Sequence, residues 1–182
     1  MWFRGPLNSQ QLLLNAAGFQ LLWWCCVLLG NSALPLAAAL LLLHLWMHPQ
    51  PQPELRVVVL TAAIGMSVDA VLGHAGLYRF ADQAMIPLLQ LPWWLLLLWL
   101  GFGACLRQSL AWLRPHPLLA AVSGGLAGGA SYWAAARLGA VEFPLGNTVT
   151  ALVIGALWLA LLPLLLYLAQ ATPKPLPGGK PC

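Results

Sequence analysis

One aspartate inside a long apolar run is the residue best suited to chemistry in this sequence. Asp69 lies within the apolar segment 55–77. Insertion scales assign a cost of roughly 2.5 to 3.5 kcal/mol to an acidic side chain at the centre of a membrane helix. We therefore expect Asp69 to face the interior of a helix bundle and to have a partner there. Gly65 and Gly73, one turn away on either side, form a small-residue face that suits a close seam or a pocket.

Arg137, near the end of a later apolar run, is the expected partner of Asp69. A charge-assisted pair would offset the desolvation of both groups. Such a pair either lines an outward-facing polar pocket for a ligand or only fixes the register of two helices. A further alternative is that Arg137 extends its side chain to the outer membrane interface, near Glu142.

Three other polar residues complete the candidate pocket. Tyr132 precedes Arg137 on the same apolar run, and Asn15 lies in the first run. His74 follows Asp69 by five residues, which places the two side chains about 140° apart on a regular helix. An interfacial histidine is therefore favoured over a proton relay. The candidate intramembrane polar pocket comprises Asp69, Arg137, Tyr132, His74 and Asn15.

The signatures of known catalytic and cofactor sites are absent from the sequence. It has no phosphate-binding glycine loop, no His-Glu-x-x-His, no paired cysteines for a metal and no nucleophile elbow. His44 and His48 are four residues apart, but Pro49 follows and no third ligand is evident. We predict no catalytic residue, no cofactor and no metal. An enzyme is the less favoured class, because one Asp and one Arg alone do not supply the nucleophile, metal or acid–base pair that catalysis needs.

The elements that position these residues follow from the composition. Hydrophobic residues make up 61% of the 182 positions and charged residues 7%, whereas soluble domains carry about 25% charged residues. The composition predicts an all-α polytopic membrane bundle. The net charge of +4 comes from Lys and Arg scattered between apolar runs, so nucleic acid is not an expected partner.

Apolar runs separated by polar or Pro/Gly-rich breaks predict six transmembrane helices in a single domain, 1–171. The predicted spans are 11–30, 33–46, 55–77, 88–106, 118–139 and 148–169. The second is the weakest, because it is short for a full crossing and carries Pro35 near its start; a half helix is the alternative. Residues 172–182 are predicted to be a flexible Pro/Gly-rich cytoplasmic tail.

The distribution of Lys and Arg predicts the orientation, because cytoplasmic loops hold an excess of positive residues. Six spans with both termini cytoplasmic leave only Arg79 and Arg137 outside. The positive residues then on the cytoplasmic side are Arg4, Arg56, Arg107, Arg114, Lys174 and Lys180. The predicted location is the inner (cytoplasmic) membrane of a bacterium, crossed several times.

Glycines at four-residue spacing mark the fifth predicted span. Gly124 pairs with Gly128 in this pattern, and Gly125 pairs with Gly129. Such spacing lets two helix backbones approach closely within a bilayer. Packing within one chain is the favoured interpretation, and a homo-oligomer formed through these glycines is the alternative.

Four segments together resemble a family of small bacterial inner-membrane proteins known only as a domain of unknown function. The segments are 15–24 (NAAGFQLLWW), 67–69 (SVD), 106–113 (LRQSLAWL) and 129–139 (GASYWAAARLG). The resemblance extends from about residue 12 to about residue 168. Genes of that family often accompany genes for cyclopropane-fatty-acid-synthase-like methyltransferases and flavin-dependent oxidoreductases. The resemblance thus implies a place in membrane-lipid modification or envelope stress, and it transfers no active-site residue.

The leading functional hypothesis is an accessory membrane component that binds or positions a lipid, or a lipid-modifying membrane enzyme, through the polar pocket. The second is a small-solute transporter subunit that resembles the substrate-binding component of a vitamin importer, because six spans in so short a chain match its size. A scaffold protein, in which the charges serve only structure, is a further alternative.

Overall fold

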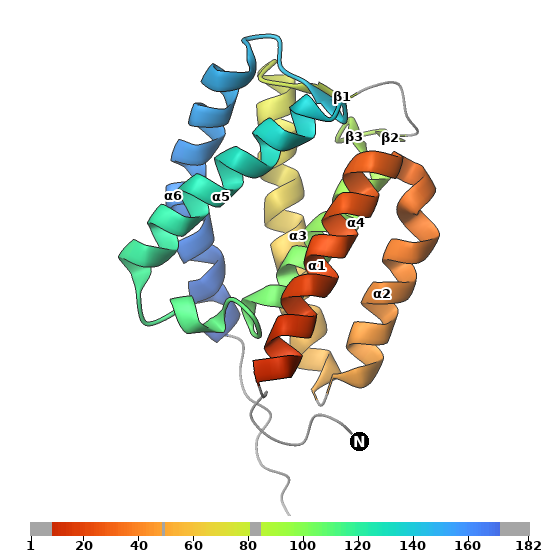
Figure 1. Cartoon of the computed structure of the whole chain (residues 1–182), viewed down its shortest axis with the longest axis vertical. Helices are drawn as coiled ribbons and strands as arrows, with labels where there is room; N and C mark the ends of the chain where they lie inside the picture. The colour runs from red at the N-terminus through yellow and green to blue at the C-terminus, as the bar shows by residue number, and fades with distance from the viewer. Residues whose placement is uncertain (1–8, 49, 81–84, 172–182) are drawn as a thin grey trace, which may run out of the picture.

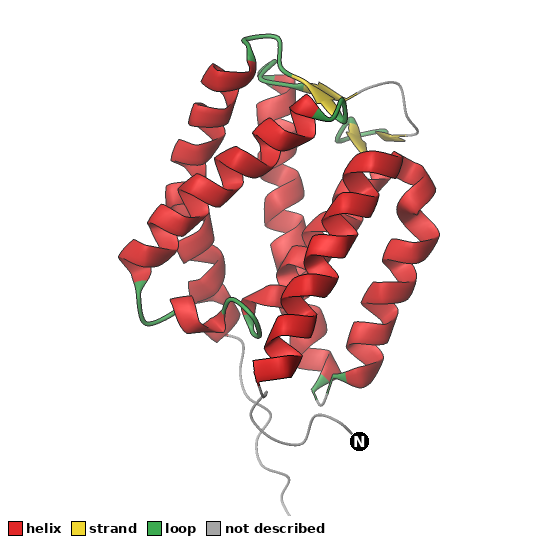
Figure 2. Cartoon of the chain, viewed as in Figure 1, coloured by secondary structure: helices red, strands yellow, loops and turns green. Residues whose placement is uncertain are grey.

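Within the described residues the chain forms six α-helices, and the predicted all-α class is confirmed (Figures 1 and 2). The computed structural model describes residues 9–48, 50–80 and 85–171. The helices are α1 (Ser9–Leu29), α2 (Leu34–Met47), α3 (Pro51–His74), α4 (Trp93–Leu106), α5 (Pro117–Arg137) and α6 (Asn147–Ala171). Two 3-10 turns join them, η1 (Gly30–Ala33) and η2 (Ala111–Leu113). The tail predicted for residues 172–182 lies outside the described residues.

Four two-residue strands gather at one end of the bundle, which we call the strand end (Figure 2). Strand β1 (Arg79–Phe80) pairs antiparallel with β4 (Val141–Glu142), which sets Arg79 opposite Glu142. Strand β2 (Met85–Ile86) pairs antiparallel with β3 (Leu91–Pro92). The opposite end, which contains η2, is called the η2 end. The β1–β4 pair joins the α3–α4 connection to the α5–α6 connection, while β2 and β3 both lie within the α3–α4 connection.

The helices pack as two groups (Figure 1). Helix α5 lies along α6, while α3 lies along α4 and the α1–α2 hairpin packs mainly on α4. Backbone contacts between the two groups are sparser and are mainly those of α6 with α3 and α4. Helix α1 begins and α6 ends at the η2 end of the bundle. This arrangement leaves space for a cleft between α1 and α5.

The first apolar run is folded back on itself. Residues Ser9–Met47 form one stretch that is long and apolar enough to cross a membrane, but Gly30 has a φ of +57°, a left-handed conformation that glycine adopts without steric cost. The 3-10 turn that follows reverses the chain into α2. Helix α2 has 14 residues, which gives a length of roughly 21 Å at 1.5 Å per residue, shorter than the bilayer hydrocarbon.

Three helical stretches are long and apolar enough to cross a membrane by length and composition: Ser9–Met47, Pro51–His74 and Asn147–Gln170. The apolar helix Trp93–Leu106 is shorter. Large apolar side chains also cover the outside of the bundle; Leu126 is 72% exposed and Leu152 is 69% exposed. Such a surface is stable against lipid and not against water, so the chain has the features of a membrane protein.

Two helix boundaries differ from the predicted spans by four residues or more, and each has a local cause. Helix α3 begins at Pro51, four residues before the predicted start at 55, because Pro is well suited to the first turn of a helix. Glu54 is consequently helical, not part of a loop. Helix α4 begins only at Trp93, after Leu91 and Pro92 pair in β3.

The glycines of α5 face α6 within the same chain. A Cβ on Gly129 would lie 2.9 Å from the carbonyl oxygen of Ala151, and one on Gly124 would lie 2.7 Å from the carbonyl oxygen of Trp158. On α6, a Cβ on Gly155 would likewise lie 2.9 Å from the carbonyl oxygen of Gly125. Close packing within one chain, the favoured interpretation of these glycines, is therefore what the structure shows.

Candidate functional site: an aromatic cleft over a buried aspartate

The carboxylate of Asp69 is the centre of a buried hydrogen-bond cluster. Its side chain is 1% exposed and accepts from three donors. The hydroxyls of Tyr78 and Tyr132 donate to Oδ1 at 2.7 and 2.6 Å. The indole Nε1 of Trp99 donates to Oδ2 at 2.6 Å. Since these donors belong to the turn after α3, to α5 and to α4, the Asp69 cluster ties three parts of the fold to α3.

Two glycines on or just after α3 make these contacts possible. A Cβ on Gly65 would overlap the indole of Trp99, so the missing side chain leaves room for the ring beside Asp69. Gly76 has a φ of +78°, which reverses the chain and returns Tyr78 over the end of α3. The reversal is closed by the bond from Leu77 N to the Leu72 carbonyl, 3.1 Å long.

In the structure Asp69 contacts Tyr132, as the predicted pocket requires. Asp69 and Arg137 do not contact each other, and each has other partners. Arg137 is exposed at the end of α5, and its guanidinium carbon lies 5.6 Å from the ring centroid of Trp133. That distance is within the range of a cation–π contact. The donors that offset the burial of Asp69 are thus two phenols and an indole, where the sequence suggested a guanidinium.

His74 and Asn15 lie apart from the Asp69 cluster. The Nδ1 atom of His74 is 2.7 Å from the carbonyl oxygen of Ala70, one turn back on its own helix. The side chain of Asn15 bonds to α4 and its end: its Oδ1 accepts from the Ser109 hydroxyl at 2.6 Å, and its Nδ2 donates to the Ala104 carbonyl at 3.2 Å. The five residues of the predicted pocket therefore do not form one site.

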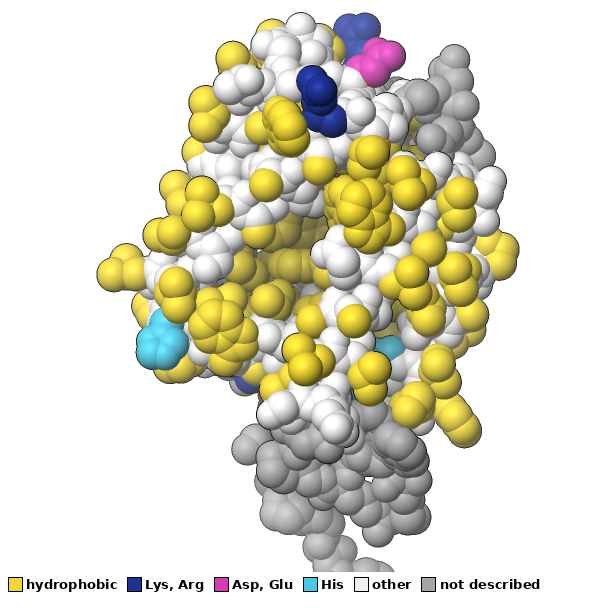
Figure 3. Space-filling model, in the orientation of Figure 1, with side chains coloured by type: hydrophobic (Ala, Val, Ile, Leu, Met, Phe, Trp, Pro, Cys, Tyr) yellow, Lys and Arg dark blue, Asp and Glu magenta, His cyan; other side chains and the backbone are white. Residues whose placement is uncertain are grey.

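A cleft of about 460 Å³ lies between the two helix groups, and two of the Asp69 partners, Trp99 and Tyr132, line it. Figure 3 shows the hollow in the middle of this face, floored by apolar side chains. The aromatic residues that line it are Phe19, Trp23, Trp24, Phe80, Trp94, Trp99, Phe102, Tyr132 and Trp158. Because its carboxylate accepts three bonds, Asp69 positions the cleft wall and presents no free charge to it.

The deep wall of the cleft is a stack of rings. Trp99 of α4 lies parallel to Trp158 of α6, with centroids 5.5 Å apart and an interplanar angle of 8°. Phe102 meets both rings edge-on, at 5.9 and 5.3 Å. A Cβ on Gly128 would overlap the Trp158 indole, so this glycine allows α5 to close over the stack. Offset and edge-on ring pairs of this kind hold a rigid apolar surface.

Two indole N–H groups add polarity to the cleft. Trp23 of α1 donates from Nε1 to the Ser131 hydroxyl of α5 at 2.8 Å, which bridges the two sides. Trp94 is 2% exposed, and its Nε1 is buried with no hydrogen-bond partner among the described residues. Since buried donors are nearly always paired, Trp94 marks a position where a bound molecule could supply an acceptor.

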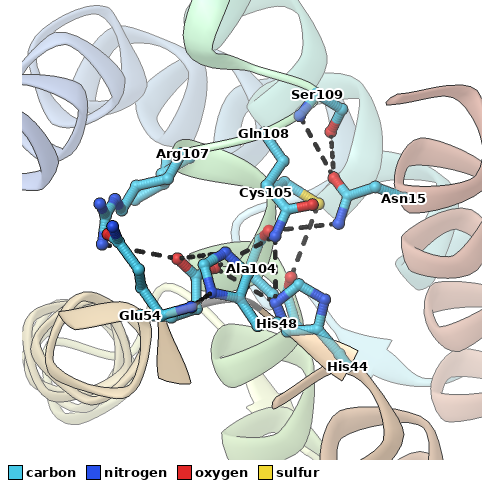
Figure 4. Close-up of polar contacts among 12 residues, drawn as sticks. Asn15, His44, His48, Glu54, Ala104, Cys105, Arg107, Gln108 and Ser109 are labelled. Carbon is cyan, nitrogen blue, oxygen red and sulfur yellow. Dashed lines mark hydrogen bonds and ion pairs between the residues drawn. The ribbon is translucent and has the colours of Figure 1, made fainter. Parts of the chain in front are cut away.

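A second polar cluster, which we call the Glu54 cluster, lies at the η2 end (Figure 4). Glu54 is fully buried, with His44 Nε2 3.2 Å from its Oε1 and Gln108 Nε2 3.4 Å from the same atom. His48 Nε2 and Arg107 Nη1 lie 3.5 and 3.8 Å from Oε2. Burial lowers the pKa of His48, while the charge of Glu54 opposes that shift.

Sequence reasoning did not find the Glu54 cluster, although one signal was available. The four-residue spacing of His44 and His48 puts both rings on one face of the chain at the end of α2. A start of α3 at Pro51 places Glu54 in the first helical turn, opposite them. Within the described residues, no group of three or more His, Cys, Asp and Glu side chains is arranged to hold a metal ion.

Comparison with known proteins agrees with the resemblance seen in the sequence. The comparisons with curated proteins and with solved structures found no match. Residues 12–164 match the family described as Protein of unknown function (DUF2878), which covers most of the chain and includes both the Asp69 and the Glu54 clusters. The chain therefore belongs to the DUF2878 family of proteins of unknown function.

Proposed function

We propose that this protein is a multi-pass protein of the bacterial inner membrane that binds the hydrocarbon chain of a membrane lipid in the aromatic cleft. In this role it is an accessory component of membrane-lipid modification or of the envelope stress response, and lipid-modifying membrane enzymes are its partners. The observation that carries the proposal is the apolar cleft of about 460 Å³ between α1, α4 and α5. Its volume falls in the range of roughly 300 to 1,000 Å³ typical of ligand sites.

The surroundings of the cleft favour a lipid as its occupant. The helices that border it expose Leu21 at 53%, Trp24 at 45% and Leu126 at 72%, so hydrocarbon surrounds the opening when the chain is in a bilayer. An acyl chain can pass sideways into such a cleft without crossing water. Among the described residues no charged side chain lines the cleft, which disfavours the alternative of a polar solute carried by a transporter subunit.

The indole of Trp94, whose Nε1 has no hydrogen-bond partner among the described residues, indicates where the polar part of the lipid lies. A buried donor without a partner costs about 1 to 3 kcal/mol. Trp94 Nε1 is covered in the structure, so neighbouring side chains must shift before an ester carbonyl oxygen can accept from it. Trp94 is in the first turn of α4, at the strand end of the cleft. The proposed ligand is therefore an acyl-ester lipid whose chain extends from Trp94 toward the Trp99–Trp158 stack.

Filling the cleft tests the proposal. Ala130 of α5 lines the cleft and is exposed in it, so Ala130→Phe adds a ring to the space of an acyl chain. We expect mass spectrometry of the purified wild-type protein to find a retained lipid, and retention to fall at least about tenfold in the variant, since about 1.4 kcal/mol of lost affinity gives that factor.

The matched control is Ala156→Phe, at an exposed position of α6 that does not line the cleft. It should keep the lipid. Equal lipid retention by Ala130→Phe and the wild type would contradict the proposal. A wild-type protein that retained a small polar metabolite in place of lipid would favour the transporter alternative.

We also propose that all six helices cross the membrane, with both termini in the cytoplasm. Arg56 and Arg114 then lie on the cytoplasmic side at the η2 end, with Arg107 beside them, and Arg79 and Arg137 lie outside at the strand end. This distribution follows the excess of positive residues in cytoplasmic loops.

Reporter fusions at four exposed loop positions test this topology. Fusions at Gln50 and His116 should give cytoplasmic reporter activity, and fusions at Leu88 and Leu145 should give external activity. A shared side for Gln50 and Leu88 would exclude a crossing by α3, and with it the six-span topology.

A further inference from the structure

A second cavity, of about 310 Å³, lies between α1, α2 and α4 toward the η2 end. Leucines of α1 and α2 form its walls, among them Leu14, Leu22, Leu40 and Leu41. Its polar lining side chains are Gln11, Asn15, His44, His48 and Gln108, and His44 and Gln108 contact each other at one end. A cavity with apolar walls and one polar end has the shape of a site for an amphiphile, a molecule with an apolar chain and a polar head.

Behind the polar end of the cavity, the negative charge of Glu54 lies close to the positive charges of Arg107 and Arg114. The carboxylate of Glu54 is fully buried and lies behind His44, 3.2 Å from its Nε2. Arg107 faces the same carboxylate at 3.8 Å, and Arg114 donates nearby to the Leu106 carbonyl at 2.8 Å. An anionic head would meet the charge of Glu54, and a cationic head would meet the two arginines. The electrostatics therefore favour an uncharged head.

The hydrogen bonds of His48 and His44 indicate which ring nitrogen is available to bind the polar head of the ligand. His48 Nδ1 accepts from the backbone N–H of Gln50 at 3.1 Å, so its hydrogen is on Nε2, toward Glu54. His44 also turns Nε2 to the carboxylate, and an ionised carboxylate only accepts. The hydrogen of a neutral His44 is then on Nε2 as well. The amide nitrogen Nε2 of Gln108 lies 3.3 Å from this atom, and in this tautomer it donates to Glu54 Oε1, 3.4 Å away. The Nδ1 atom of His44 remains as an acceptor with no partner among the described residues.

We propose that this cavity binds an uncharged amphiphile with a hydroxyl head, such as a long-chain alcohol, whose O–H donates to Nδ1 of His44. Glu54 holds the His44 ring in the tautomer that accepts this bond, as a carboxylate behind a metal-binding histidine fixes the tautomer of that ring. The leucine walls take the hydrocarbon chain. This site shares only Phe19 with the lining of the aromatic cleft, so the inference goes beyond the proposed function and does not rest on it.

The test is photolabelling of the full-length protein in phosphatidylcholine vesicles with a diazirine-bearing dodecanol. We expect labelled peptides from α1 and α2, and competition by unlabelled dodecanol. Dodecyl methyl ether has no hydrogen to donate and should compete about fivefold less well, the factor that corresponds to one hydrogen bond of about 1 kcal/mol. Dodecylamine and dodecanoate should also compete less well than dodecanol.

Gly18→Leu is the variant that fills the cavity, because Gly18 lines it and a Cβ there meets nothing within 4 Å. It should abolish labelling of α1 and α2, whereas Ala17→Leu, at the adjacent exposed position outside the cavity, should not. His44→Phe keeps the ring and removes the acceptor, so the alcohol should lose its advantage over the methyl ether.

Four outcomes would overturn the inference: equal competition by alcohol and ether, stronger competition by the amine or the carboxylate, equal labelling of Gly18→Leu and Ala17→Leu, or loss of labelling on addition of Zn²⁺. The last would assign His44 and Glu54 to a metal. Ala130→Phe separates this site from the aromatic cleft, because it should leave alcohol labelling unchanged whether or not the cleft binds lipid.

Discussion

Asp69→Ala should lower the free energy of unfolding by about 2 to 5 kcal/mol. Interhelical hydrogen bonds in membrane proteins contribute about 0.6 kcal/mol on average and reach about 1.7 kcal/mol. Asp69 accepts three such bonds, at 2.6 to 2.7 Å. Its removal also leaves three donors buried without an acceptor, which places the expected loss toward the upper end of that range.

Reversible unfolding in mixed micelles, followed by circular dichroism as the denaturing detergent increases, measures this loss. Glu142→Ala is the control, because Glu142 is an acidic residue at an exposed position in β4; it should change the free energy by less than about 0.5 kcal/mol. Equal stability of Asp69→Ala and the wild type would show that the three bonds contribute nothing to the fold.

The same substitution should also reduce lipid retention. Trp99 and Tyr132 are the two Asp69 partners that line the cleft, and without the carboxylate both lose the hydrogen bond that orients them. Asp69→Asn keeps an acceptor oxygen but turns an amide donor toward one of the donors, so its effects should be intermediate. An Asp69→Asn protein that folds and still loses lipid would assign Asp69 a positioning role beyond stability.

The helices of this fold were predictable from the sequence because each is a long apolar run with Pro, Gly or polar residues at its ends. Composition alone identifies a bundle with lipid as its solvent. The limits of α3 and α4 were harder to predict, because Pro51 begins a helix and Pro92 belongs to a strand. A proline that lies between two apolar runs is compatible with the first turn of a helix and with a short strand.

The sequence indicated that Asp69 needs a partner, but not which one. A guanidinium is the obvious choice by charge, yet Arg137 lies at the exposed end of α5. The actual donors, Tyr78, Trp99 and Tyr132, belong to residue types that also occur as simple core or interface residues in any membrane helix. Only the rotation of α4 and α5 against α3 selects them, and sequence periodicity around an all-apolar helix does not define that rotation.

The Glu54 cluster was missed for a different reason. A carboxylate next to a predicted loop is ordinarily solvated, and Glu54 lies three residues after Pro51. The cluster forms because α2 ends beside the start of α3 and the end of α4, which brings together His44, Glu54 and Gln108. That proximity is a property of the hairpin geometry, and the spacing of the two histidines was its only trace in the sequence.

Gly103→Leu should be about 3 kcal/mol less stable than the wild type, while Gly18→Leu should be as stable or up to about 1 kcal/mol more stable. A Cβ on Gly103 would lie 2.8 Å from the backbone Cα of Val58, so α4 must move away from α3 to admit a side chain. Gly18 faces open space, and leucine is the better helix former. The same unfolding titration measures both variants.

The Gly103 contact and the Asp69 cluster should be coupled. Trp99 precedes Gly103 by one turn on α4, and the bond from Trp99 to Asp69 needs the same close approach of α3 that Gly103 permits. Once Gly103→Leu has separated α3 from α4, the bond from Trp99 to Asp69 is already weakened, so Asp69→Ala removes less stabilising free energy. The double variant should therefore lose less stability than the two single losses combined, by about 1 kcal/mol or more. Strict additivity would mean that Asp69 and Gly103 stabilise the α3–α4 contact independently.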